Sequence, residues 1–353
     1  MSKKTILITA ASGEGFPSFG RYLKRLGKEF RIVGVSPDKE AAGFTFIDKG
    51  YFVSQPEDKN YIRDLLTVCK KEKVKILIPS DPKELVLLAG NKNKFEKIGT
   101  LVLSSSLESV RTAEDKEKFF MFCKEKGIPV PDFIKVKNYK DFRKAVFQLG
   151  YPEKVVCFKP IISSGTRGFR VLSSKNDRLH NLLKDHPGGV MADFSEVCSI
   201  LKTAEYFPEI LVMEFLPGKE YTVDVLADNG KTQIIIPRTR DKVLLGASFL
   251  GRAVEEKEVI EYSKRIVEGL NLDAIVGIQF KKDEKDVPKA IEVNPRIQGA
   301  TLLSVAAGVD LIDLAIKNAL GKSWKKPKIK WGTRMIRYFD EIYQDEKGKF
   351  FKI

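Results

Sequence analysis

The sequence predicts an α/β unit built on a parallel sheet, followed by an α+β unit of mixed strands and helices. The chain has 353 residues, more than the roughly 100 to 200 expected of one domain, so it should form two or three compact units. From residue 4 to about 112, short apolar strands alternate with helices, which is typical of a parallel sheet covered on both faces. Beyond that point runs of antiparallel strands with helices on one side indicate an α+β unit.

The first unit, residues 1–112, is predicted to be Rossmann-like, with helices at 17–28, 58–72 and 82–97 between the strands TILITA, RIVGVS, VKILIPS and TLVLSS. The first turn, Gly13-Glu14-Gly15-Phe16-Pro17-Ser18, is GxGxxS where a dinucleotide-binding turn has GxGxxG or GxGxxA. Asp38 follows the second strand, near the place of a ribose-binding acid. This imperfect match leaves an NAD-dependent dehydrogenase as a remote alternative.

Two acids, Asp81 and Glu84, follow the third of these strands. They lie where the first unit could face the second and bind an acceptor amine. Asp and Glu also favour the first turn of a helix, so a simple helix start explains them equally well.

The second unit is predicted to begin with a charged amphipathic helix over 115–127, followed by extended backbone at Ile128-Pro129-Val130-Pro131. Mixed elements should complete it, with strands at 154–159, 169–173, 209–216 and 220–238, helices at 175–202, 255–270 and 301–320, and a hairpin at 274–294.

Composition excludes several classes of site and partner. Two histidines, His180 and His186, are too few for a multi-histidine zinc site, and the four cysteines form no CxxC pair. The cysteines stand in apolar contexts, which favours reduced core thiols and a cytoplasmic location. The net charge of +15 suggests an anionic partner, but lysines are mixed with acids throughout, so we expect no nucleic-acid-binding stripe. No stretch approaches the ~18 apolar residues of a membrane span, so we expect no membrane association.

The sharpest local signal is the hairpin. If it is centred between Lys285 and Asp286, Gln279 faces Glu292, and Asn294 points the same way as Glu292 because side chains alternate along a strand. Three oxygen-bearing side chains then converge, a sparse set that suits Mg²⁺ bound together with substrate phosphates. An ordinary exposed hairpin face with a helix cap at Asn294 is the alternative.

A lysine and a loop of small residues form the second signal. Lys159 ends the apolar strand VVCFK, and Ser163, Ser164, Gly165 and Thr166 follow within a few residues. A cation and free backbone N–H groups suit phosphate oxygens, although Ser/Gly loops most often simply turn the chain.

The third signal is the strand ILVMEFL. It ends at Pro217-Gly218, which leaves the backbone amides of Glu214, Phe215 and Leu216 for the edge of a purine. Glu220 could accept hydrogen bonds from two ribose hydroxyls. Taken alone, the segment is merely a strand and a turn.

Three arginines complete the candidate site. Arg296 follows Asn294 and could neutralise a transferred phosphoryl group. Arg238 and Arg240 point to one face of a predicted strand, where they could hold a substrate carboxylate or an acyl phosphate. A surface basic pair explains them equally well.

In this order, the segments resemble the ATP-grasp superfamily, particularly its carbamoyl-phosphate-synthetase-like branch and the carboxylate-amine ligases. The matching strings are DKEKFFMFCKEKGIPVP, VVCFKP with SSGTRG, VMEFLPGKEYTVD, and GIQF with IEVNPR. The resemblance implies a Rossmann-like pre-ATP-grasp domain over 1–112, a two-lobed ATP-grasp domain over 113–325 with a mobile lid at about 131–209, and a C-terminal extension over 326–353.

The resemblance also implies roles for single residues. Lys116 and Lys159 would bind phosphate, Glu214 and Leu216 adenine, and Glu220 ribose. Gln279, Glu292 and Asn294 would hold metal, with glutamine standing where many ATP-grasp ligases have a carboxylate. The cofactors implied are ATP and Mg²⁺, with Mn²⁺ as the other ion considered and the number of ions, one or two, left open.

We therefore expect an ATP-dependent ligase that activates a small-molecule carboxylate as an acyl phosphate for attack by an amine. Such chemistry needs metal, cations and exclusion of water more than a histidine base. Carbamoyl- or carboxy-phosphate-type kinase chemistry and a non-catalytic ATP-binding module are the alternatives. A homodimer stays open.

Overall fold

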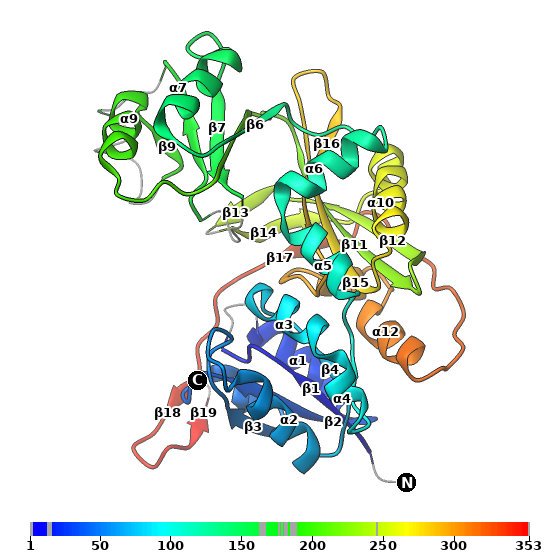
Figure 1. Ribbon diagram of the computed structural model, residues 1–353. Helices are drawn as coiled ribbons and strands as arrows, with labels where there is room; N and C mark the ends of the chain where they lie inside the picture. The colour runs from blue at the N-terminus through cyan, green and yellow to red at the C-terminus, as the bar shows by residue number, and fades with distance from the viewer. Residues whose placement is uncertain are drawn as a thin grey trace. The chain divides into compact units, whose positions relative to one another are not determined.

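The computed structural model describes residues 3–12, 16–161, 167–175, 177, 179, 183, 189–244 and 246–351 (Figure 1). The chain divides into two compact units. The first consists of Met1–Ala113, Tyr221–Ile278 and Val293–Ile353, and the second of Glu114–Glu220 and Gln279–Glu292.

A five-stranded parallel sheet occupies the N-terminal part of the first unit. Its order is β3-β2-β1-β4-β5, and each neighbouring pair is parallel, so the predicted Rossmann-like fold is confirmed. The strands are β1 (Lys4–Ile8), β2 (Phe30–Ser36), β3 (Lys49–Phe52), β4 (Val74–Ile78) and β5 (Leu101–Val102), and the helices are α1 (Phe16–Leu26), η1 (Ala42–Phe46), α2 (Tyr61–Lys71), η2 (Pro82–Glu84), α3 (Leu85–Gly90), α4 (Lys92–Glu96) and α5 (Leu107–Glu114).

Alternate residues of β1 enter two different cores. Ile6 and Ile8 pack in the same core as Leu23 of α1, whereas Leu7 packs in the core that contains Leu65 of α2. Successive side chains of a strand point to opposite faces, so a sheet covered on both faces needs the continuous apolar runs of this sequence.

Glu84 closes the start of η2 at the carboxyl end of β4. Asp81 caps the turn by accepting from the Lys83 N–H at 2.9 Å, and Glu84 accepts from the N–H groups of Ser80 and Asp81 at 3.0 Å each. The hydroxyls of Thr9 and Tyr61 also donate to Glu84, which is 1% exposed. Internal donors surround this carboxylate, so it is part of a helix start, and the interpretation of Glu84 as an amine-binding residue is wrong.

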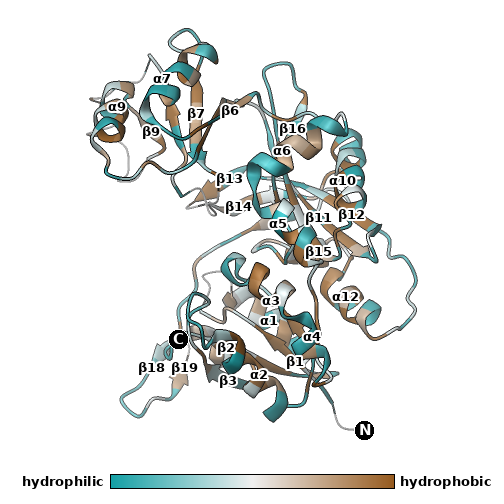
Figure 2. Ribbon diagram, in the orientation of Figure 1, coloured by the Kyte–Doolittle hydropathy of each residue, from teal (hydrophilic) through white to brown (hydrophobic). Residues whose placement is uncertain are grey.

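The second unit contains a five-stranded sheet of order β6-β10-β7-β8-β9. Its strands fall within or next to residues 131–209, for which a mobile lid stays a prediction. Phe142 of helix α7 packs against Phe158 of β7, with ring centroids 5.2 Å apart. In Figure 2 strand β7 is coloured as hydrophobic, as expected of a strand that contributes to this core. The elements are α6 (Lys116–Glu125), β6 (Phe133–Val136), α7 (Tyr139–Gln148), β7 (Val156–Pro160), β8 (Arg170–Leu172), β9 (Met191–Ala192), α9 (Phe194–Thr203) and β10 (Ile210–Glu214).

A four-stranded sheet of order β12-β11-β15-β16 carries the predicted hairpin. The α+β prediction is confirmed, and no helix among the described residues combines the length and the apolar character that a membrane crossing needs. The elements are β11 (Glu220–Asp228), β12 (Lys231–Thr239), β13 (Lys242–Leu244), β14 (Ala247–Arg252), α10 (Lys257–Gly269), β15 (Ala274–Lys282), β16 (Pro288–Asn294), α11 (Leu302–Ala306), α12 (Leu311–Ala319), β17 (Arg334–Ile336), β18 (Tyr343–Gln344) and β19 (Phe350–Phe351).

The turn of the β15–β16 hairpin differs from the predicted one. The Asp283 N–H donates to the Val287 carbonyl at 3.0 Å, and the Asp286 N–H to the Asp283 carbonyl at 3.1 Å. Asp286 has φ of 63°, the left-handed conformation of the additional residue in a bulged turn. The turn is therefore centred on Lys285, and the predicted centre between Lys285 and Asp286 is wrong. The facing of Gln279 and Glu292 was derived from that centre and loses this support, so their shared role as metal ligands stays a prediction from the family resemblance alone.

Candidate functional site

Lys116 begins α6 and is held inside the second unit. Asp115 caps this helix by accepting from the Lys118 N–H at 3.1 Å. The Lys116 side chain is 4% exposed, and its Nζ donates to the Ile161 carbonyl at 3.3 Å. Burial lowers the pKa of Lys116, while the negative charge of Glu292 opposes that shift.

Lys159 lies near the end of β7 in the same unit. Its Nζ donates to the Ile291 carbonyl at 3.3 Å and lies 5.7 Å from the centroid of the Phe120 ring. Burial and, second, the charge of Lys116 lower the pKa of Lys159 to about 8, with Glu292 again acting in the opposite direction. Two lysines from different elements are thus close enough to repel each other, and both lie within electrostatic range of one carboxylate.

The loop that should follow Lys159 lies outside the described residues, including Ser163, Ser164, Gly165 and Thr166. The described residues resume at Arg167, and the next residue, Gly168, has φ of 73°. A Cβ there would lie 2.7 Å from Cδ of Pro160, so glycine allows the end of the loop to approach the end of β7.

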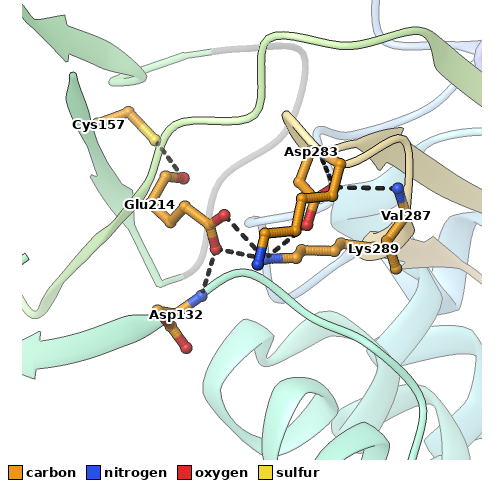
Figure 3. Close-up of polar contacts among 7 residues, drawn as sticks. Asp132, Cys157, Glu214, Asp283, Val287 and Lys289 are labelled. Carbon is orange, nitrogen blue, oxygen red and sulfur yellow. Dashed lines mark hydrogen bonds and ion pairs between the residues drawn. The ribbon is translucent and has the colours of Figure 1, made fainter. Parts of the chain in front are cut away.

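Glu214, at the end of β10, is the centre of a polar network in the second unit (Figure 3). Its carboxylate oxygens lie 2.8 and 2.6 Å from Nζ of Lys289 and accept from the Asp132 N–H at 3.0 Å. Its backbone N–H donates to the Asp132 carbonyl at 2.9 Å, and its carbonyl accepts from the Cys157 thiol at 3.4 Å. Lys289 also lies 3.4 Å from Asp283.

These contacts correct one part of the predicted purine site. The Glu214 amide was expected to be available for a purine edge, but it is bonded to Asp132, so that expectation is wrong. Phe215 and Leu216 come next in the chain, and Leu216 is 5% exposed. Sequence reasoning missed Lys289. Its signal was a lysine within the otherwise apolar start of a strand.

Glu220 and two of the predicted metal ligands, Gln279 and Glu292, lie on strands in the part of the chain assigned to the second unit. Glu220 begins β11, and its negative charge opposes the lowering of the Lys159 pKa, so it lies within electrostatic range of that lysine. Gln279 on β15 and Glu292 on β16 are both half-buried. Lys159 therefore lies within electrostatic range of Glu220 and Glu292.

Asn294 and Arg296 follow in the part of the chain assigned to the first unit. Asn294 is 8% exposed, and Nη2 of Arg296 donates to its Oδ1 at 3.4 Å. Nη1 of Arg296 donates to the Ile297 carbonyl at 3.0 Å. These bonds fix the two side chains at the end of β16.

Arg238 and Arg240 lie in different surroundings. Nε of Arg238, a residue 2% exposed, lies 3.1 Å from the buried carboxylate of Asp224. The hydroxyls of Thr301 and Ser304 donate to the same carboxylate at 3.0 and 2.9 Å. Nη2 of Arg240 donates to the Gly246 carbonyl at 2.8 Å. The surface-pair interpretation is therefore wrong for Arg238, which belongs to a buried ion pair.

The described residues hold no group of three or more His, Cys, Asp or Glu side chains able to bind a metal ion. One carboxylate with two amide oxygens fits a hard ion whose remaining ligands are water and phosphate, as is usual for Mg²⁺. It does not fit Zn²⁺, whose sites use several thiolates or imidazoles.

Comparison with known families and proteins gives matches for both parts of the chain. The family described as "PylC-like, N-terminal domain" matches residues 6–103, and "ATP-grasp in the biosynthetic pathway with Ter operon" matches residues 206–340. The carbamoyl phosphate synthase large chain of Clostridium acetobutylicum is 26% identical over 317 residues, which cover 86% of this chain and 27% of that protein. The chain thus spans about a quarter of the length of that relative.

Solved structures give the same fold. An N5-carboxyaminoimidazole ribonucleotide synthetase in complex with ADP aligns with a TM-score of 0.69 and 16% identity, over 93% of this chain and 80% of that one. Biotin carboxylase from Campylobacter jejuni aligns with a TM-score of 0.68 and 18% identity, over 93% of this chain and 74% of that one. L-amino acid ligase from Bacillus licheniformis aligns with a TM-score of 0.64 and 16% identity, over 93% of this chain and 76% of that one.

The sheets and these matches define a Rossmann-like domain that is followed along the chain by an ATP-grasp fold. The predicted resemblance is confirmed: residues 206–340 match an ATP-grasp family, residues 6–103 match the PylC-like N-terminal domain, and the chain is similar in sequence to carbamoyl phosphate synthase.

Proposed function

We propose that this protein is an ATP-dependent ligase that converts a small-molecule carboxylate into an acyl phosphate for attack by an amine. The observation that carries the proposal is the convergence of Lys116 and Lys159 beside Glu292 within the second unit. Two buried neighbouring cations repel each other, and Glu292 opposes the resulting fall in both pKa values only in part. The phosphates of ATP would add negative charge beside both lysines, beyond that of Glu292.

The nucleotide would occupy the second unit. Lys116 and Lys159 would neutralise the phosphates, and Glu220 would accept hydrogen bonds from ribose hydroxyls. Because the Glu214 amide is already bonded, the backbone of Phe215 and Leu216 would contact the purine. The lid segment at about 131–209 would close over the nucleotide and exclude water.

Gln279, Glu292 and Asn294 would hold Mg²⁺, and Mn²⁺ could use the same oxygen ligands. When bound, the ion would neutralise charge on the ATP phosphates. A carboxylate is a poor electrophile because its oxygen leaves badly, and phosphorylation replaces that oxygen with a good leaving group. Arg296 and Arg240 would orient the acyl phosphate while the amine attacks, releasing phosphate.

One alternative has its own support. The similarity to carbamoyl phosphate synthase favours bicarbonate as the carboxylate, which would give carboxy-phosphate as the intermediate. We also propose a reducing compartment such as the cytoplasm. The four cysteines are buried, and burial raises the pKa of Cys69, Cys123 and Cys157 to about 12, which keeps these thiols unreactive.

The test is a screen of ADP release with Mg-ATP against a matrix of carboxylates, including bicarbonate, and amines, including ammonia, with mass spectrometry of the products. The ligase predicts ADP release that requires both partners and a product containing a new C–N bond. Release with bicarbonate and ammonia alone would favour the alternative. ATP binding without turnover in any combination would contradict both and indicate a nucleotide-binding module.

A further inference from the structure

Lys289 joins two segments that the proposed nucleotide site needs to hold together. It lies on β16, three residues before Glu292, and its Nζ reaches both carboxylate oxygens of Glu214 at the end of β10 (Figure 3). Asp283, from the turn of the same hairpin, lies 3.4 Å from that Nζ. The side chains of Lys289 and Glu214 are 15% and 29% exposed, so the pair is partly shielded from solvent.

Glu214 also bonds to the segment that leads into β6. Its N–H and carboxylate bond to the carbonyl and N–H of Asp132 at 2.9 and 3.0 Å. Asp132 precedes β6, and Glu214 ends β10, so these bonds tie together the two strands by which the chain enters and leaves the five-stranded sheet of the second unit. Through its ion pair with Glu214, Lys289 connects these two strands to the β15–β16 hairpin.

The segment after Glu214 lies against the same hairpin. Nζ of Lys281 lies 5.4 Å from the centroid of the Phe215 ring. The Gly218 N–H donates to the Lys282 carbonyl, and the Lys282 N–H to the Lys219 carbonyl, both at 2.9 Å. A Cβ on Gly218 would lie 2.7 Å from the Lys282 carbonyl oxygen, so this close approach requires glycine.

We propose that Lys289 is a positioning residue that sets the place of the 215–219 segment and thereby the affinity for the nucleotide base. The inference rests on the proposed function and adds to it the base-positioning role of this lysine. Its action would be through Glu214 rather than by touching nucleotide. The bonds of Lys116 and Lys159 named above run to the Ile161 and Ile291 carbonyls and not to Glu214 or Lys289, so we expect the proposed phosphate site to respond much less to this ion pair.

The charges of the network are matched for this role. Burial by itself would lower the pKa of Lys289, but the hydrogen bond and charge of Glu214, together with Asp283, raise it overall. The pKa of Asp283 is lowered although its burial acts in the opposite direction, because backbone N–H groups and Lys289 stabilise its charged form. A neutral side chain at 289 would leave two carboxylates facing each other without their cation.

The experiment compares two probes, ATP and inorganic tripolyphosphate, each with Mg²⁺, by calorimetry. Tripolyphosphate tests the phosphate site alone, whereas ATP also tests the base segment. The variants are Lys289→Met, Lys289→Arg, Glu214→Gln and the double variant Lys289→Met/Glu214→Gln. Lys285→Met, at the exposed tip of the same hairpin, is the matched control.

We expect Lys289→Met to weaken ATP binding about tenfold and to leave tripolyphosphate binding within about twofold. Lys289→Arg should retain most of the ATP affinity because it keeps the charge. Glu214→Gln should behave like Lys289→Met, and the double variant should add little, because the two side chains act as one unit. Lys285→Met should bind both probes like the wild type.

Unchanged ATP affinity in a folded Lys289→Met protein would overturn the inference, as would equal weakening of both probes or an equal effect of Lys285→Met. If Lys289→Met does not fold, Glu214→Gln provides the same comparison while preserving side-chain shape. A wild-type protein that does not bind ATP would overturn the proposed function and this role together. A wild type that binds ATP with variants that match it would overturn this role alone.

Discussion

Each unit of the molecule buries cations, but the two units compensate them differently. In the first unit Arg238 lies against Asp224, whose carboxylate also accepts from Thr301 and Ser304. In the second unit the hydrogen bonds of Lys116 and Lys159 described above run to backbone carbonyls at 3.3 Å, and burial lowers the pKa of both.

This difference indicates that the buried cation of the first unit stabilises the fold, whereas those of the second unit serve ligand binding. A buried ion with a closely matched partner holds elements together, because removing one partner leaves the other uncompensated. Buried lysines whose pKa is depressed are held in a state that an incoming anion would improve. The same residue property, a buried positive charge, therefore predicts opposite outcomes when it is removed from the two units.

The largest expected effect is on stability, in the first unit. Asp224→Ala should lower the free energy of unfolding by about 3–5 kcal/mol, because Arg238 would remain buried without its partner. Chemical denaturation measures this loss. Asp313→Ala is the control, since Asp313 pairs with Lys317 at 2.6 Å in a partly exposed position and should cost less than about 1 kcal/mol. Equal losses in the two variants would show that burial of the Arg238 pair adds nothing.

The next effect is on turnover, in the second unit. Glu292→Ala should reduce ADP release by at least about 10²–10³, because it removes the only carboxylate of the proposed metal site while the fold persists. Steady-state kinetics and thermal melting separate the two readouts. Glu284→Ala, on the exposed turn of the same hairpin, should keep full activity. Unchanged ADP release by a folded Glu292→Ala protein would remove Glu292 from the metal site.

Lys159→Met tests the comparison directly. ATP binding should weaken by about 10–100-fold, since hydrogen bonds to charged groups contribute about 1.5–3 kcal/mol. Stability without nucleotide should not fall, because the substitution removes an unfavourable buried charge. Calorimetry and denaturation provide the two measurements, with Lys154→Met at an exposed position as the control. A loss of stability as large as that of Asp224→Ala would assign Lys159 to the fold instead.

Much of the fold could be predicted from the sequence because its signals are local. The continuous apolar runs of β1 and β4 and the helix starts beside them follow from neighbouring residues, and so does Lys159 at the end of an apolar strand. The missed contacts are long-range. Thr301 and Ser304 lie 77 and 80 residues from Asp224, and Lys289 lies 75 residues from Glu214.

Two errors have specific physical causes. A surface pair explained Arg238 and Arg240 because arginines at alternate positions of a strand give the same pattern on an exposed face and on a buried one. Only the tertiary partner, here Asp224, determines whether the side chain is buried. The hairpin centre was misplaced because Asp286 adopts a left-handed conformation, which adds a residue to the turn that alternation cannot reveal. Neither feature is written in the local pattern.

The smallest expected effect is a pH dependence that has opposite signs for stability and for binding. In the folded protein without nucleotide, the pKa of Lys159 is about 8, below its ordinary value. Between these two values the unfolded chain holds a proton that the folded chain has lost, so this residue's contribution to stability increases as pH rises above about 8. ATP needs the charged lysine, so binding must take up a proton there, and affinity should fall, by at most about tenfold per pH unit.

The measurement is ATP affinity by calorimetry from about pH 7.5 to 9.5, in buffers of different ionisation enthalpy so that proton uptake is read directly. Lys159→Arg is the matched control, because arginine stays charged throughout this range and should show a shallower decline. Any decline that remains reports Lys116, whose pKa burial also lowers. If wild type and Lys159→Arg decline in parallel with no difference in proton uptake, Lys159 is fully charged before ATP arrives. The second unit would then compensate its buried cation as completely as Asp224 compensates Arg238, and the contrast between the two units would be lost.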